Sequence, residues 1–208
     1  MIDVYKNYKT ALFKSSFPRG EEPKAILVLV PGSNHDGRDL VHSKAFKKFS
    51  KENECALIGC FFEDIDPTAI EGYADASGGS GQALLDFIEK EGWGHLPIFL
   101  WGFSAGGQFN YEMTCWAPER IAGFVVNKGG FYYTALAPPA TRATPGLFFI
   151  GNHDDLFRQY IVAGIYMMNK RDHNCIWQLV EEPVGHDPGD SVELSLEFFK
   201  EILEKALN

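Results

Sequence analysis

The sequence predicts an α/β fold, built on a mostly parallel sheet with helices on both faces. Apolar runs of strand length alternate with segments of helical spacing along most of the chain, which is typical of such sheets. Some runs, such as residues 25–30, are apolar throughout, as expected for a strand buried on both faces. A length of 208 residues with 45% hydrophobic content suffices for one core of this kind. We therefore expect a single domain over residues 1–208, without a large cap domain.

The predicted strands are apolar runs that end at turn residues or polar segments. In chain order they cover residues 25–30, 56–61, 98–101, 121–127, 147–150 and 175–180. The first of them stops at Pro31-Gly32, a strong indication of a turn. Residues 4–17 are expected to add one or two strands at an edge of the sheet.

Helices are predicted where apolar residues recur with helical spacing between these strands. They cover residues 40–52, 83–88, 108–116, 160–168 and 191–207. Segment 78–81, Gly-Gly-Ser-Gly, lacks the lysine of a P-loop and the glycine order of a dinucleotide fingerprint, so we interpret it as a helix entry. Residues 131–145 are rich in proline and threonine, which predicts a loop.

The charge and the termini restrict the partners and the location. The chain has 28 acidic against 19 basic residues and a net charge of −9, so it repels phosphate backbones and no nucleic-acid partner is expected. Its first residues lack the pattern of a signal peptide, and no apolar stretch approaches the ~20 residues that span a bilayer. We expect a cytoplasmic protein without membrane contact. The 4 cysteines lack CxxC spacing, which favours buried reduced thiols.

The segment Gly102-Phe103-Ser104-Ala105-Gly106 has a GxSxG pattern between a predicted strand and a predicted helix. A serine held at a sharp strand-to-helix turn needs small neighbours two residues before it and two after it. The hydroxyl can then reach an acyl carbon, and the N–H of Ala105 at the helix start points toward developing negative charge. The pattern predicts Ser104 as the nucleophile toward an ester or a related acyl compound.

Two other serines beside glycines lack this context. Ser33 follows Pro31-Gly32 without a second glycine, and Ser80 has no apolar strand before it. The alternative for residues 102–106 is a glycine-rich connection that packs a helix onto a sheet. The flanking strand and helix favour the nucleophile.

A serine hydroxyl needs a base within hydrogen-bonding reach, and that base needs a third group to orient it. Asp154 and Asp155 follow the strand predicted at 147–150, and His186 follows the strand predicted at 175–180. The chain order is therefore serine, acid, histidine. His153 is the alternative base, although it directly precedes the acid and neighbouring side chains on an extended turn diverge. For the aspartates and for His186 the alternative is a solvated loop residue.

The order of these groups, the GxSxG elbow, a GxxD turn at 151–154 and the late pair Gly185-His186 resemble the α/β-hydrolase superfamily over residues 25–207. The string at 102–109 is similar to small single-domain esterases of the polyhydroxybutyrate-depolymerase and feruloyl-esterase type. The resemblance implies the α/β-hydrolase fold, with Ser104 as nucleophile and His186 as general base and then general acid. It also implies that Asp154, at the GxxD position, orients the imidazole.

The same resemblance implies an oxyanion hole formed by two backbone N–H groups. One belongs to Ala105, and the other comes from the turn after the first long strand. Ser33 is the candidate and Asn34 the second choice. Many relatives have His-Gly where this chain has Pro31-Gly32. The alternative is an ordinary polar turn before a helix.

Aromatic residues that follow strand ends are candidates for a substrate pocket, because clefts form there in open sheets. Phe103, Phe131 and Tyr132 occupy such positions and are predicted to line an acyl or aryl pocket. Only residues 131–145 or 63–79 are long enough to fold over the site, which predicts an open cleft.

We therefore predict a serine hydrolase that cleaves a small carboxylic ester through an acyl-enzyme, with no metal and no cofactor. The expected partner is the small-molecule ester, and the sequence indicates no oligomeric state. A thioesterase, lactonase or peptidase of the same fold is the nearest alternative, because the same groups serve all acyl transfers. A non-catalytic ligand-binding protein of this fold is the alternative from another class.

Overall fold

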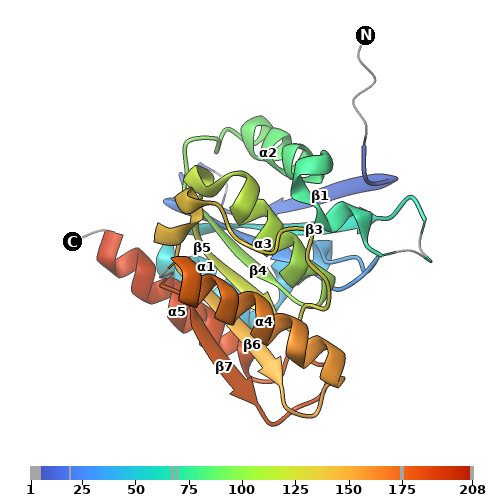
Figure 1. Cartoon of the computed structure of the whole chain (residues 1–208). Helices are drawn as coiled ribbons and strands as arrows, with labels where there is room; N and C mark the ends of the chain where they lie inside the picture. Colours follow the sequence, from blue (N-terminus) through green and yellow to red (C-terminus); the bar gives the residue numbers. More distant parts are fainter. Residues whose placement is uncertain (1–5, 19, 67, 69, 174–175, 207–208) are drawn as a thin grey trace.

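The computed structural model describes residues 6–18, 20–66, 68, 70–173 and 176–206 of the chain. Its centre is a 7-stranded sheet in the order β1-β3-β2-β4-β5-β6-β7 (Figure 1). β1 is antiparallel to β3, and all other neighbouring strands are parallel. The strands cover Thr10–Ser16 (β1), Ala25–Val30 (β2), Cys55–Glu63 (β3), Ile98–Gly102 (β4), Ile121–Asn127 (β5), Gly146–Gly151 (β6) and Gln178–Glu182 (β7). This confirms the predicted α/β fold.

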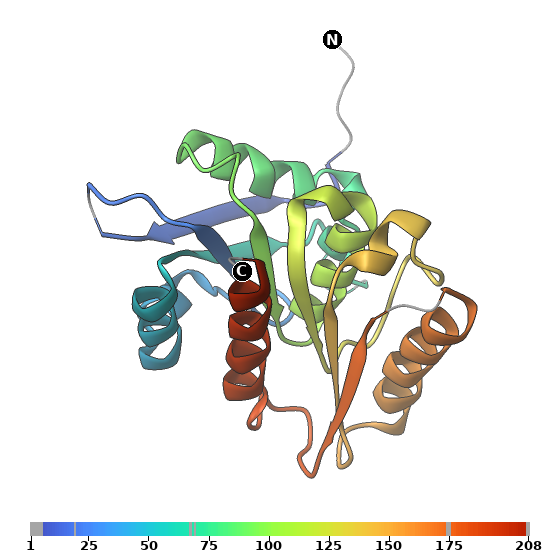
Figure 2. The ribbon, with the colours of Figure 1, turned by 90° about the vertical axis from the view of Figure 1, so that its left-hand side faces the viewer.

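Helices cover both faces of the sheet, as Figures 1 and 2 show. α1 and α5 pack on one face, and α2, α3 and α4 pack on the other. They cover Lys44–Asn53 (α1), Ser80–Lys90 (α2), Ala105–Trp116 (α3), Leu156–His173 (α4) and Ser191–Ala206 (α5). Short 3-10 turns cover Arg38–His42, Gly72–Ala74, Ala76–Gly78, Pro118–Arg120 and Pro139–Ala143.

The core consists of two apolar layers because side chains of each central strand alternate between the faces. In β2, Leu27 and Leu29 contribute to the layer under α1 and α5, and Ile26 and Val28 to the layer under α2, α3 and α4. Every residue of β2 is buried. This two-sided burial is why the strand is apolar throughout.

Several elements extend one to three residues beyond their predicted bounds, and three others differ more. The predicted helix 40–52 is divided, because Ser43 has extended backbone (φ −57°, ψ 137°) between a 3-10 turn and α1. α4 begins at Leu156, where the Asp155 carboxylate accepts the Phe157 N–H at 2.8 Å and caps the helix. β7 begins at Gln178 and continues to Glu182, whereas Cys175 lies outside the described residues.

The antiparallel edge strand β1 confirms the strand expected within 4–17, except that residues 4 and 5 lie outside the described residues. Cys55, Cys60 and Cys115 are buried and none of them forms a disulfide, as expected. Burial raises the pKa of the Cys55 thiol to about 12. In the part of the chain that the structure describes, no helix is long and apolar enough to cross a membrane.

The parallel strands all end at the same edge of the sheet. The loops that follow β2, β4, β5, β6 and β7 therefore meet there, and these are the loops that carry the predicted functional residues.

Truncating an aromatic ring in the core should lower stability far more than truncating one at the surface. Phe124 is fully buried, with its ring centroid 5.8 Å from Phe148 and 5.4 Å from Trp177. We expect Phe124→Ala to lower the free energy of unfolding by about 3–5 kcal/mol through lost burial and a residual cavity. Phe157 is 61% exposed, and Phe157→Ala should change it by less than about 1 kcal/mol. Urea denaturation of both variants measures these changes, and equal losses would contradict this description of the core.

Candidate active site

Ser104 lies at a sharp turn between β4 and α3. Its backbone has φ 54° and ψ −120°, a conformation that non-glycine residues rarely adopt. The Ser104 N–H donates to the Asn127 carbonyl at 2.8 Å, and the Phe103 N–H donates to the Val30 carbonyl at 3.2 Å. Hydrogen bonds to β5 and β2 therefore hold the turn in its unusual conformation.

The two glycines of the GxSxG pattern are required by close backbone packing. A Cβ atom at Gly102 would collide with the carbonyl of Gly106, and a Cβ atom at Gly106 would collide with the carbonyls of Val30 and Pro31. The turn thus brings α3 directly against the end of β2. This is the packing that the sequence pattern indicates.

His186 and Asp154 extend from this serine in one chain of hydrogen bonds. The Ser104 Oγ is 3.0 Å from His186 Nε2, and His186 Nδ1 is 2.7 Å from Asp154 Oδ2. Because an ionised carboxylate only accepts, this network assigns the ring proton to Nδ1 and leaves Nε2 free to accept from the serine hydroxyl. The Asp154 side chain is only 3% exposed, whereas that of His186 is 29% exposed.

The neighbours of Asp154 have other contacts. Asp155 donates its N–H to Asp154 Oδ1 at 2.7 Å, while its own carboxylate caps α4. The His153 side chain is exposed, and its backbone N–H donates to the Val184 carbonyl at 2.9 Å. The Arg158 guanidinium lies 3.8 Å from Asp154 Oδ1. The structure thus brings Asp154 to the histidine, and neither Asp155 nor His153 occupies that position.

Two backbone N–H groups remain available beside the serine. The N–H groups of Ser33 and Ala105 donate no hydrogen bond to any residue that the structure describes. Ala105 begins α3, and a Cβ at Gly32 would lie 3.6 Å from Ser104 Cβ, so the loop after β2 passes directly beside Ser104. The arrangement suits the stabilisation of an oxyanion by these two donors.

The loop after β2 is secured by an aspartate that the sequence patterns did not single out. Asn34 has φ 52°, and its side chain turns to Asp64, donating to Oδ2 at 3.2 Å and accepting the Asp64 N–H at 2.9 Å. Asp64 also accepts the Tyr73 N–H at 3.4 Å. Its burial raises the pKa of the Asp64 carboxyl, and the hydrogen bonds oppose that rise.

The aromatic candidates have different surroundings. The Phe103 ring lies 5.0 Å from the His186 ring, centroid to centroid. The Phe131 ring instead contacts Tyr133 at 5.1 Å. Tyr132 packs its ring 5.2 Å from Tyr111 with its hydroxyl buried, and this burial raises the pKa of that hydroxyl. Tyr132 therefore points into the core, and the substrate-binding roles of Phe131 and Tyr132 stay predictions.

The start of the 131–145 segment is attached to α3 by two buried polar side chains that sequence reasoning also missed. Gln108 Oε1 accepts the Gly130 N–H at 2.9 Å. Glu112 Oε1 accepts the N–H groups of Tyr133 and Thr134 at 2.7 and 2.9 Å. Burial raises the pKa of the Glu112 carboxyl. Local sequence carries no indication of these contacts, since both residues look like ordinary polar positions on a helix.

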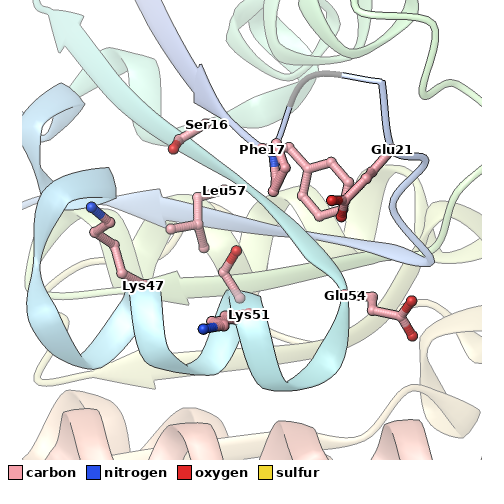
Figure 3. A pocket seen from close by; sticks show the side chains of 9 residues that line it. Ser16, Phe17, Glu21, Lys47, Lys51, Glu54 and Leu57 are labelled. Atoms are coloured by element: carbon pink, nitrogen blue, oxygen red, sulfur yellow. The ribbon is translucent and has the colours of Figure 1, made fainter.

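A hollow of about 500 Å³ lies elsewhere on the molecule (Figure 3). Phe17 and Leu57 line it together with Lys47 and Lys51 of α1. Leu57 is near the amino-terminal end of β3, which is parallel to β2. The hollow therefore lies near the amino-terminal ends of the parallel strands, whereas Ser104 follows the carboxyl end of β4. It therefore does not adjoin the candidate active site.

The fold is that of the α/β hydrolases, and comparison with solved structures gives the same result. The structure of esterase PE8 superposes with a TM-score of 0.65 at 20% identity, covering 91% of this chain and 99% of that one. LpqC, a poly(3-hydroxybutyrate) depolymerase from Bordetella parapertussis, superposes with a TM-score of 0.72 at 15% identity, covering 91% and 83%. FphF, a fluorophosphonate-binding serine hydrolase from Staphylococcus aureus, gives 0.59 at 13%, covering 90% and 87%. Neither a protein-family model nor a curated protein sequence matches the chain.

Adding one methyl group at two glycines should have opposite effects on stability. Gly106→Ala forces a Cβ against the carbonyl of Val30 and should lower the free energy of unfolding by about 1–3 kcal/mol. Gly164 lies within α4, where a Cβ atom would point into open space. Gly164→Ala should therefore raise the free energy of unfolding by up to about 1 kcal/mol. Denaturant unfolding measures both, and a neutral Gly106→Ala would contradict the close approach of α3 to β2.

Proposed function

We propose that this protein is a serine hydrolase that cleaves a small carboxylic ester through an acyl-enzyme intermediate. One observation carries the proposal: the hydrogen bonds from Ser104 Oγ to His186 and from His186 to Asp154 start at a nucleophile elbow. This geometry supports a catalytic triad, in which each group would have a defined role.

In the first half of the reaction, Ser104 Oγ attacks the acyl carbon while its proton passes to His186 Nε2. Asp154 stabilises the imidazolium through the hydrogen bond to Nδ1. The carbonyl oxygen becomes an oxyanion that accepts from the N–H groups of Ala105 and Ser33. Collapse of the tetrahedral intermediate breaks the ester C–O bond, and the alcohol leaves with the proton from Nε2.

In the second half, a water molecule attacks the acyl-Ser104 ester and gives its proton to His186 Nε2. The same donors stabilise the second oxyanion, and collapse returns the proton to Ser104 Oγ and releases the carboxylic acid. Every proton and electron pair is accounted for by these side chains and water.

The neighbours in fold support an ester as the substrate. One is named an esterase, another a poly(3-hydroxybutyrate) depolymerase and a third a fluorophosphonate-binding serine hydrolase. An ester is also more reactive than an amide toward the same nucleophile.

Replacing the nucleophile should abolish turnover. Ser104→Ala is expected to lower kcat/KM for nitrophenyl esters by roughly 10⁴-fold or more, because no oxygen remains to form the acyl-enzyme. A fluorophosphonate probe should label the unmodified protein at Ser104, as peptide mass mapping would show. Ser80 is a serine outside the elbow, and its hydroxyl donates to the Tyr73 carbonyl at 2.6 Å. Ser80→Ala therefore serves as the matched serine control and should keep both the esterase activity and the labelling. A folded protein that takes up no label would instead be a ligand-binding member of this fold.

The two adjacent aspartates should separate sharply in activity. Asp154→Asn removes the carboxylate that accepts from His186 Nδ1, and it should lower kcat by about 10⁴-fold by favouring the wrong tautomer. Asp155→Asn keeps an oxygen that can accept the Phe157 N–H, so it should change kcat less than about 3-fold. Steady-state kinetics on one nitrophenyl ester decides this, and a reversed order would assign the triad acid to Asp155.

A further inference from the structure

Lys128 and Glu182 form a buried ion pair behind the candidate triad. Lys128 directly follows β5 and has φ 56°, and Glu182 is the last residue of β7. Lys128 Nζ lies 2.5 Å from Glu182 Oε2, and the two side chains are 0% and 6% exposed. Nothing in the proposed chemistry uses either group, so their burial requires another explanation.

The Glu182 carboxylate closes the loop that carries His186. Its second oxygen, Oε1, accepts the N–H of Asp190 at 3.1 Å. Glu182 and Asp190 flank the loop 183–189, and residues 186–190 are all exposed. Because the apolar core contributes little to this loop, its position depends on polar contacts such as the one that joins its two ends.

The lysine connects that closure to the serine. Lys128 Nζ also donates to Asn127 Oδ1 at 3.0 Å, and the carbonyl of Asn127 holds the Ser104 N–H at 2.8 Å. Asn127 Nδ2 in turn donates to Ser191 Oγ at 2.6 Å, at the start of α5 just beyond the loop. One polar network thus joins the elbow to both ends of the histidine loop.

The glycine of the GxxD turn gives the network room. A Cβ at Gly151 would lie 3.0 Å from Lys128 Cε, 2.6 Å from the Gly185 carbonyl and 2.7 Å from the Val184 carbonyl. The lysine stem and the histidine loop therefore cross the end of β6 in close contact with its backbone. The acid turn, the lysine and the loop form one tightly packed unit.

We propose that Lys128 and Glu182 are positioning residues that hold His186 in register with Ser104. The proposal deepens the proposed function and rests on it for its kinetic consequences. An apolar pair of similar volume can replace a buried ion pair without loss of stability. It cannot accept the Asp190 N–H or donate to Asn127, so it cannot hold the two ends of the loop at a fixed distance from the elbow.

The decisive variant is Lys128→Met/Glu182→Leu, which keeps the volume and removes both charges. We expect thermal stability to stay near that of the unmodified protein, while kcat per fluorophosphonate-titrated site falls about 100-fold and KM changes little. Glu182→Gln has one acceptor oxygen for the two donors, Lys128 Nζ and the Asp190 N–H, so it should lower kcat, but by less than the double variant does. Ser50 supplies the structural control. It is buried, and its hydroxyl donates to the carbonyl of Cys55 at the start of β3, far from the candidate triad. Ser50→Ala should lower stability without changing kcat.

A readout that needs no turnover separates failure of this proposal from failure of the proposed function. The His186 Nδ1 proton, hydrogen-bonded to Asp154, should give a downfield proton resonance in the unmodified protein that broadens or vanishes in the double variant. Unchanged kcat and an unchanged resonance would overturn the positioning role, whether or not the protein is an esterase. If the double variant does not fold, Glu182→Gln decides by the same two measurements: a lower kcat and a broadened resonance support the role, and unchanged values overturn it.

Discussion

The hydrogen bond from the Ser104 N–H to the Asn127 carbonyl is the contact on which the rest of the site depends. Ser104 has a backbone conformation that costs on the order of 1–3 kcal/mol, and only surrounding contacts can maintain it. They are supplied by β5 through Asn127, by β2 through the Val30 carbonyl, and by α3 through the close approach at Gly106. These contacts therefore hold the turn so that the Ser104 hydroxyl, the N–H of Ala105 and the loop after β2 lie side by side.

The histidine and its acid reach this point from the other half of the sheet. They follow β7 and β6, and no sheet hydrogen bond joins these strands to β4, the strand that precedes Ser104. Loop contacts must therefore help to set the distance between the imidazole and the serine, and a displacement of about 1 Å would be enough to impair the proposed proton transfer. The network of Asn127, Lys128 and Glu182 spans this gap, because it contacts the elbow at one end and the loop of His186 at the other.

Local patterns predicted the central strands and the elbow, and together with the resemblance to the α/β hydrolases they predicted the candidate triad, whereas the supporting polar contacts were not predictable. GxSxG and GxxD are short patterns whose glycines each meet a local steric need. Asp64, Glu112, Lys128 and Glu182 have no such pattern, and their partners lie far away in sequence: 54 residues separate Lys128 from Glu182. Glu182 follows another glutamate and resembles a solvated strand end. The inward turn of Tyr132 depends likewise on Tyr111 in another element.

Three of the loops around Ser104 are each tied to the scaffold by one buried carboxylate. Asp64, Glu112 and Glu182 are 2%, 4% and 5% exposed, and each accepts at least one backbone N–H. Burying a carboxylate is unfavourable unless its oxygens are fully engaged, so each of these groups favours a single conformation of the loop that it contacts. The loop after β2, the 131–134 segment and the loop that carries His186 are thereby held in place. Preorganised donors and bases need no rearrangement as charge develops, and this is the condition under which a small site without a large cap can stabilise a transition state.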